Sequence, residues 1–336
     1  MAWLRRHIAL VVCGVAAFWG CSLIDEDVRD CQPVQPPAPE SKVEYELSLV
    51  TNLTTEINTA LNLEADVQVA SALKTHLEKV FTDHAYDVDL SFYDVEGQKA
   101  RLHHERHVMD ASQTSYTLSI PVRRYMHLAL ANLERNTLLH LDGDQFLESA
   151  ALLQDVRDTV PSHTTGVFTA RLPMNVREGV DQEFQVNLSM TNCAAAVVLD
   201  TLDSGIKDVK VYAKGFASGF MVADSTYLFQ HTPIVQTRQL EVEKGHELCF
   251  AAVSFPSREA AVKADDILWE MRVYITLPDD TITENILGIS EPLKAGQLRI
   301  LKGVVFPNGT LIPDDQSVAL FVQPDWRPGT EHDVDL

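Results

Sequence analysis

Apolar and polar residues alternate with a period of two over several stretches in the first half of this chain. The clearest alternation runs over residues 43–53 and 87–94. A similar pattern covers 115–130 and is interrupted at Pro121, whose nitrogen has no hydrogen to donate to a sheet. This period is typical of β-strands with one buried face. We therefore predict strands at 43–53 and 87–94, and two more within 115–130.

Helical spacing is rarer in this sequence. Residues 63–84 carry apolar side chains at steps of four, which places them on one face of a helix: Ala65, Val69, Leu73, Leu77 and Phe81. A second, short helix is predicted at 145–158. Helix is therefore expected to be a minor component of the fold.

Beyond Gly166, short apolar stretches of strand length follow one another, separated by turns that contain Gly, Pro or Asp. The predicted strands are 167–172, 184–190, 194–199, 209–214, 226–229, 239–243, 247–255, 268–277, 297–306 and 317–323. Many short strands at near-regular spacing favour an all-β sandwich.

A boundary between two domains is expected within 159–166, Thr-Val-Pro-Ser-His-Thr-Thr-Gly. A chain of 336 residues is long enough for two domains. We predict an N-terminal β-sandwich domain with short helices at 42–160 and a C-terminal β-sandwich domain at 161–336.

The start of the chain has the pattern of a secretory signal. Arg5 and Arg6 precede an apolar run over 8–18, and this run is shorter than the roughly 20 residues that a membrane-spanning helix needs. Gly20 then precedes Cys21, as at the cleavage site of lipoprotein signal peptidase. We predict a signal peptide at 1–20 and a lipid on Cys21. The alternative is an ordinary secretory signal followed by an incidental cysteine.

Acidic residues follow Cys21 directly, at Asp25, Glu26 and Asp27. An acidic cluster in this place resembles the surface-export signal of Bacteroides-type lipoproteins, which implies a protein that faces the cell exterior. The alternative is a solvated linker in which the acids have no role. Four prolines within 32–40 favour an extended spacer, so 21–41 is predicted to be a linker between the lipid and the folded domains.

The net charge of the chain argues against one class of partner. It is −21 for the whole sequence, and −23 after Arg5 and Arg6 leave with the signal peptide. Such a surface repels nucleic acid and gains no affinity from released counterions. No nucleic-acid partner is expected.

The cysteines leave one pairing open. Cys13 leaves with the signal peptide and Cys21 is taken by lipid, so that Cys31, Cys193 and Cys249 remain. A Cys193–Cys249 disulfide is one alternative, because both residues lie in apolar segments of the same predicted domain. The other alternative is two buried free thiols that act as small apolar side chains.

No catalytic, metal or cofactor site is predicted. The best metal-like run, at 103–107, reads His-His-Glu-Arg-His, and its second and third histidines are too close for the helical zinc motif His-Glu-x-x-His. We expect this run to form a solvated polar loop between strands. Nucleophile, phosphate-loop and paired Cys-x-x-Cys motifs are also missing from the sequence.

Several segments together resemble a known family. They are Cys21 with its acids and Cys31, then 87–94, 120–132, Gly219-Phe220 with 224–227, 253–256, 291–297 and 325–329. Their order and spacing resemble the fimbrial anchor family of Bacteroides-type bacteria, lipoproteins that hold the base of type V pili. The resemblance implies two tandem transthyretin-like β-sandwich domains and no enzymatic activity. It also implies pilin (fimbrillin) subunits and outer-membrane lipid as partners.

Assembly by strand exchange, which the resemblance also implies, directs attention to the last predicted strand. Alternation within 317–323 places Val318, Leu320 and Val322 on one face. This segment is a candidate donor strand for a neighbouring subunit. The alternative is that it closes the sheet of its own domain.

A second class of function also remains open. The same export signal serves surface glycan- or ligand-binding lipoproteins. Trp269 and Trp326 are the tryptophans left after the signal peptide, and they are few for sugar stacking.

Overall fold

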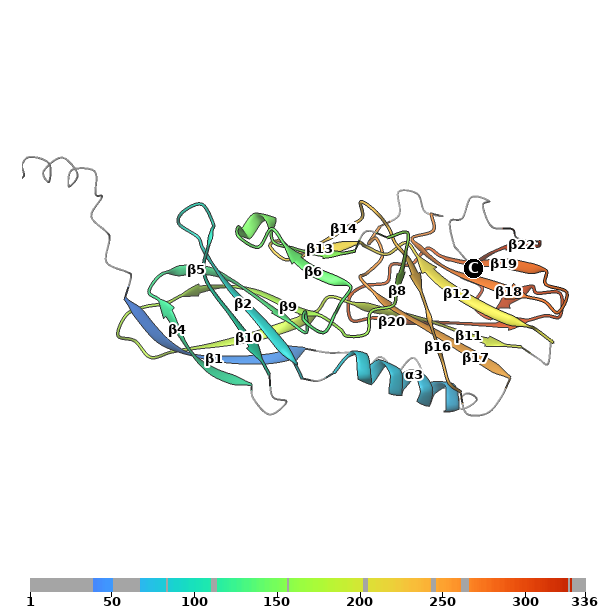
Figure 1. The fold of residues 1–336 in the computed structure, drawn as a ribbon, viewed down its shortest axis with the longest axis horizontal. Coiled ribbons are helices and arrows are strands. Elements are labelled where there is room, and N and C mark those ends of the chain that lie inside the picture. The colour runs from blue at the N-terminus through green and yellow to red at the C-terminus, as the bar shows by residue number, and fades with distance from the viewer. Residues whose placement is uncertain are drawn as a thin grey trace, which may run out of the picture. The chain divides into compact units, whose positions relative to one another are not determined.

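The structure is a computed structural model, which describes residues 39–50, 67–82, 84–109, 114–155, 157–201, 205–242, 246–260, 266–325 and 327. Strands dominate these residues, and one α-helix accompanies them (Figure 1). The predicted all-β sandwich fold with a minor helical component is confirmed. In the part of the chain that is described, no helix has the length and apolar character required to span a membrane.

A seven-stranded sheet takes its strands from the first 190 residues, in the order β3-β2-β5-β9-β10-β1-β4. The strands are β1 (Glu40–Val50), β2 (Asp87–Asp94), β3 (Arg101–Val108), β4 (Ser115–Pro121), β5 (Arg124–Ala131), β9 (Phe168–Asn175) and β10 (Gln182–Met190). The predictions for 87–94 and 115–130 are confirmed, including the break after Pro121, and the prediction for 43–53 is confirmed over its described part, 43–50. Alternate residues of β1 are buried, as the pattern of two predicts.

This sheet folds over on itself. β9 and β10 pair over two positions only, Ser189 with Thr169 and Met190 with Phe168. In a flat sheet β1 and β5 would lie about 14 Å apart, because two other strands separate them. The Tyr45 hydroxyl of β1 nevertheless lies 2.5 Å from Nε2 of His127 on β5. The two ends of the sheet therefore face each other across one core.

The helix α3 (Val67–Val80) covers a different sheet. It buries Val69, Leu73, Leu77 and Val80. These residues belong to one apolar cluster with Cys249, Ala251 and Val253 of strand β17 (Glu247–Ser254). The predicted helix at 63–84 is confirmed over its described part, with the predicted apolar face inward.

Two further sheets form the second sandwich. One has the order β16-β17-β11-β20-β21 and the other β22-β19-β18-β12-β15-β8. The first comprises β11 (Cys193–Asp200), β16 (Arg238–Leu240), β17 (Glu247–Ser254), β20 (Leu298–Val305) and β21 (Leu311–Pro313). The second comprises β8 (Thr159–Pro161), β12 (Asp208–Lys214), β15 (Ile234–Gln236), β18 (Trp269–Thr276), β19 (Ile282–Ile289) and β22 (Ala319–Gln323). Their facing side chains form one core, to which Val197, Val211 and Val273 belong.

A small sheet has the order β14-β13-β7-β6. It comprises β6 (Leu139–Asp142), β7 (Ala151–Gln154), β13 (Gly219–Met221) and β14 (Thr226–Leu228). The predicted helix at 145–158 is wrong, since a single 3-10 turn, Leu147–Ser149, is followed by β7. The apolar residues 150–153 fit a helix or a strand by themselves. Hydrogen bonding with β6 on one side and β13 on the other makes the segment a strand.

The predicted domain boundary at 160/161 stays a prediction. β9 and β10 follow this boundary in sequence but hydrogen-bond within the sheet that contains β1, β2 and β5.

Candidate functional site

Four of the predicted site residues lie outside the described residues. They are Cys21 for lipidation and Asp25, Glu26 and Asp27 for export. Their roles stay predictions.

Cys193 and Cys249 are both buried and both free. The disulfide considered for them is not formed, and the alternative of two buried thiols describes the structure. Cys249 pairs across the sheet with Val198, five residues along β11 from Cys193. That spacing is about 16 Å along a strand, and a disulfide needs its Cα atoms within roughly 7 Å. The two side chains also belong to different apolar clusters, on opposite faces of the sheet.

The chemistry of these thiols is that of core residues. The Cys193 thiol donates to the Phe255 carbonyl oxygen at 3.4 Å. Burial raises the pKa of Cys249 to about 12, and it also raises the pKa of Cys193. Both groups therefore stay protonated at neutral pH, which makes them poor nucleophiles and poor metal ligands.

The candidate donor strand lies at the edge of its own sheet. β22 pairs antiparallel with β19, with Leu320 opposite Leu287 and Val322 opposite Asn285. Val318, just before the strand, is 7% exposed and packs into the core with Leu320. Phe321 and Val322 are exposed by 53% and 38%. The segment pairs within its own sheet, which was the alternative. No described strand pairs with its other side, so within the described residues β22 presents an open edge with apolar side chains.

The histidine run at 103–107 is a strand, so the predicted loop is wrong. It forms β3, which pairs with β2 at the edge of the seven-stranded sheet. His103 and His107 hydrogen-bond through Nε2 to the two carboxylate oxygens of Glu105, at 2.7 and 2.9 Å. All three side chains are on one face, because they alternate along the strand. The hydrophobic pattern gives no signal for this strand, because most of its residues are polar on both faces.

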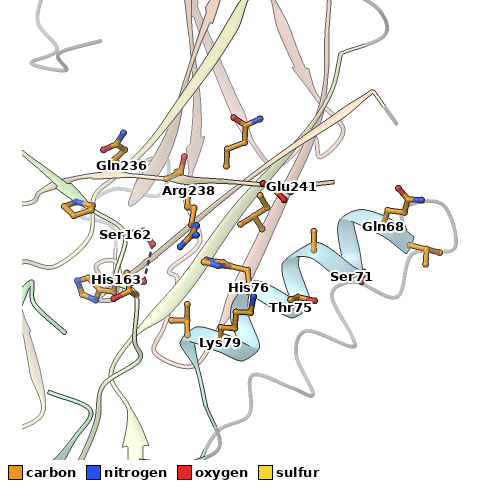
Figure 2. A pocket seen from close by; sticks show the side chains of 18 residues that line it. Gln68, Ser71, Thr75, His76, Lys79, Ser162, His163, Gln236, Arg238 and Glu241 are labelled. Carbon is orange, nitrogen blue, oxygen red and sulfur yellow. Dashed lines mark hydrogen bonds between the residues drawn. The ribbon is translucent and has the colours of Figure 1, made fainter. Parts of the chain in front are cut away.

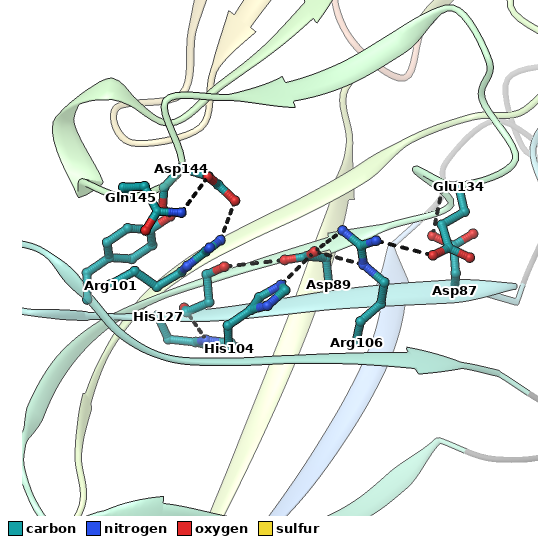
Figure 3. A network of polar contacts seen from close by, with 11 residues as sticks. Asp87, Asp89, Arg101, His104, Arg106, His127, Glu134, Asp144 and Gln145 are labelled. Atoms are coloured by element: carbon teal, nitrogen blue, oxygen red, sulfur yellow. Dashed lines mark hydrogen bonds and ion pairs between the residues drawn. The ribbon is translucent and has the colours of Figure 1, made fainter.

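The opposite face of β3 forms a polar network with β2 (Figure 3). His104 donates from Nε2 to Asp89 at 2.9 Å, and Arg106 donates from Nη2 to the same carboxylate oxygen at 3.0 Å. Asp89 is almost fully buried, so these contacts satisfy its charge. In the described chain, no group of three His, Cys, Asp or Glu side chains is arranged to hold a metal ion. Charged side chains on an edge strand discourage uncontrolled pairing, and we assign β3 this structural role.

No protein-family model matches this sequence, and no curated protein matches it. Solved structures match in fold. A candidate polysaccharide-binding protein from Bacteroides thetaiotaomicron aligns with a TM-score of 0.50 at 10% identity, over 84% of this chain and 98% of that chain. A candidate adhesin from the same species aligns with a TM-score of 0.49 at 12% identity, over 84% and 98% of the two chains. The fimbrial anchor protein Mfa2 from Porphyromonas gingivalis aligns with a TM-score of 0.47 at 9% identity, over 85% and 98%. The first alignment shows a shared fold.

Proposed function

We propose that this chain is a lipid-anchored protein of the cell surface that holds the base of a fimbria through contacts with pilin subunits. The observation that carries the proposal is the open edge of β22, at the end of an all-β body. An open edge presents unpaired backbone N–H and C=O groups to which a strand of another subunit can add. The exposed side chains of Phe321 and Val322 supply apolar contact for such a strand.

We favour addition of a partner strand at this edge over release of β22 itself. Val318 and Leu320 pack into the core of the second sandwich, so that donation of the strand would expose them to water. Donation by Val318, Leu320 and Val322 therefore stays a prediction that is separate from the edge contact.

The membrane end of the proposal rests on the sequence. Cleavage before Cys21 would leave a cysteine that carries more than one acyl chain, and each buried CH₂ contributes about 0.8 kcal/mol to membrane binding. Asp25, Glu26 and Asp27 support export to the outer face of the outer membrane. The prolines of 32–40 would then separate the folded body from the lipid surface.

The second candidate is a surface lipoprotein that binds a glycan or another ligand. The aligned Bacteroides thetaiotaomicron structure bears the name of a polysaccharide-binding candidate. Trp269 offers no platform for sugar stacking, because it is 1% exposed. Trp326, the other tryptophan named for this role, lies outside the described residues.

Replacing Cys21 with alanine is expected to abolish lipidation and to remove the protein from the outer-membrane fraction. The reason is that acyl chains attach to the sulfur of this residue. Metabolic labelling with a fatty-acid analogue measures the first effect, and membrane fractionation the second. The matched control is Cys31→Ala, which should keep full label. Label that persists in the Cys21 variant would show that this cysteine is not the anchor.

Replacing Phe321 with aspartate is expected to detach fimbriae from an anchor that stays folded, with attached fibres reduced at least tenfold. Phe321 is half exposed, so a charge there should cost little stability while placing a desolvation penalty in the proposed interface. Electron microscopy of cells counts the fibres, and the melting temperature of the purified variant checks the fold.

The matched control is Phe146→Asp, since Phe146 has comparable exposure and precedes the 3-10 turn Leu147–Ser149, outside the sheet that contains β22. Fibres retained at normal number on a folded Phe321 variant would contradict the edge contact. Equal loss in both variants would point to a general effect of charge.

A further inference from the structure

A groove of about 940 Å³ lies between one side of α3 and the chain that leads from β15 into β16 (Figure 2). Residues 161–164, which comprise the last residue of β8 and the segment after it, also line the groove. α3 contributes Gln68, Ser71, Thr75 and Lys79, which are spaced three or four residues apart and share one stripe. The helix thus buries its apolar stripe against β17 and lines the groove with a polar one. The volume lies within the range of small-molecule sites, roughly 300–1,000 Å³.

The walls of the groove are rich in side chains that both donate and accept hydrogen bonds. Amides and hydroxyls of this kind come from both walls: Gln68, Ser71, Thr75, Gln236 and Gln239. Hydroxyl groups of a ligand need such partners, because each hydroxyl is itself a donor and an acceptor. Apolar side chains such as Val67 and Leu240 also line the groove, so it suits a ligand that presents many hydroxyls together with apolar C–H faces.

The described residues of this groove include two cations and one acid, although the chain as a whole carries −21. Lys79 and Arg238 line it from opposite walls, and neither forms an ion pair with a described residue. Glu241 is the single acid among the described residues that line the groove. His76 points toward Arg238 in Figure 2. Burial lowers the pKa of His76, and the charges of Arg238 and Lys79 lower that pKa further. Both cations therefore lie close enough to His76 to act on it.

We propose that this groove binds an acidic saccharide. A carboxylate of the sugar would bind Arg238 and Lys79, because guanidinium and ammonium groups form strong charge-assisted hydrogen bonds with carboxylates. The ring hydroxyls would bind the amides and hydroxyls of the walls. The inference does not rest on the anchor role, since the groove is formed by α3 and β16 and not by β22.

The test is calorimetric titration of the purified full chain with three acidic probes. These are trimers of galacturonic acid, glucuronic acid and N-acetylneuraminic acid. At least one should bind, and it should bind at least tenfold more tightly than a galactose trimer. The double variant Lys79→Gln, Arg238→Gln should weaken this binding at least tenfold, with little change in melting temperature because both side chains are exposed and neither forms an ion pair with a described residue.

The matched control is Lys74→Gln. Lys74 lies on the same helix and pairs with Glu78 at 3.9 Å, outside the groove, so this variant should bind as the wild type does. The proposal is overturned if none of the acidic probes binds with a dissociation constant below about 1 mM. It is also overturned if the double variant binds normally, if the galactose trimer binds equally well, or if a triglutamate peptide binds more tightly than every sugar.

Discussion

Trp269→Ala is expected to lower the free energy of unfolding by about 4 kcal/mol, as large-to-small changes of buried aromatic residues do. Trp269 is the largest of the fully buried side chains and lies in the core of the second sandwich. Its indole N–H donates to the Glu291 carbonyl oxygen at 2.9 Å, and its ring contacts Phe216. The variant loses all of these contacts and leaves a cavity between the two sheets.

Denaturant unfolding of wild type and variant measures the change. Trp269→Phe is the graded variant, since it keeps most of the buried ring and should lose less stability. Ile312→Ala is the surface control, because Ile312 is half exposed and should change stability by roughly 0.5 kcal/mol or less. A loss below about 1 kcal/mol for Trp269→Ala would contradict the role of this side chain in the core.

Acidification from pH 7 to pH 4 is expected to destabilise the fold through two buried histidines, by about 3 kcal/mol for each. Burial lowers the pKa of His127 to about 4, and it does the same to His163. In the unfolded chain both bind protons near pH 6.5. Between pH 6.5 and pH 4 the unfolded state therefore binds more protons than the folded state. The stability that these groups contribute is complete above pH 6.5 and is lost as the pH falls toward 4.

The hydrogen bonds of both imidazoles explain why they stay neutral. The Nδ1–H of His127 donates to the Ser91 carbonyl oxygen at 3.0 Å, so its Nε2 accepts from the Tyr45 hydroxyl. The Nδ1 of His163 lies 2.9 Å from the Asn192 side-chain amide nitrogen and accepts from it. In each ring the nitrogen that would take a second proton already faces a donor. Protonation would therefore break a hydrogen bond and also bury a charge.

Urea unfolding of the wild type and of the double variant His127→Gln, His163→Gln at several pH values tests this prediction. The double variant is expected to be less stable at pH 7, because it loses ring contacts such as the stacking of His127 on Phe92. Its stability should depend less on pH between 6.5 and 4. Other groups titrate in both proteins, including Asp87, whose pKa is raised by burial and which acts in the opposite direction. An unchanged pH dependence in the double variant would refute the role of the two histidines.

Local pattern was enough to predict the strands whose alternation is between apolar and polar residues. β2 begins and ends where the alternation of 87–94 does, and the break between β4 and β5 follows Pro121. The apolar face of α3 could also be predicted from the sequence, because Val69, Leu73 and Leu77 recur at helical spacing. These predictions succeeded because a face that packs against the apolar core imposes its period on the sequence. The other face of β2 is buried as well, but with polar contacts such as those of His104 and Arg106 to Asp89, so its residues stay polar.

The failures have a common physical cause. β3 alternates between polar residues, so hydrophobic period gives no signal for it, and pairing with β2 makes it a strand. β19 at Ile282–Ile289 was not predicted, although it lies between β18 and β22 in its sheet. The sequence of β7 also fits a helix, because Ala and Leu suit both structures. In each case hydrogen bonds to neighbouring strands of the sheet, distant or near in sequence, make the segment a strand.

The sequence by itself determined the all-β class, the helix and the apolar faces, since each depends on residues close together in the chain. Only the tertiary structure decided which strands meet. β1 runs parallel to β10, more than a hundred residues later, and β11 runs parallel to β20. Long-range contacts also keep Cys193 apart from Cys249 and place β22 at a sheet edge. They bring Lys79 of α3 opposite Arg238 of β16. Contacts of this kind depend on how sheets stack and fold over, and no local pattern encodes them.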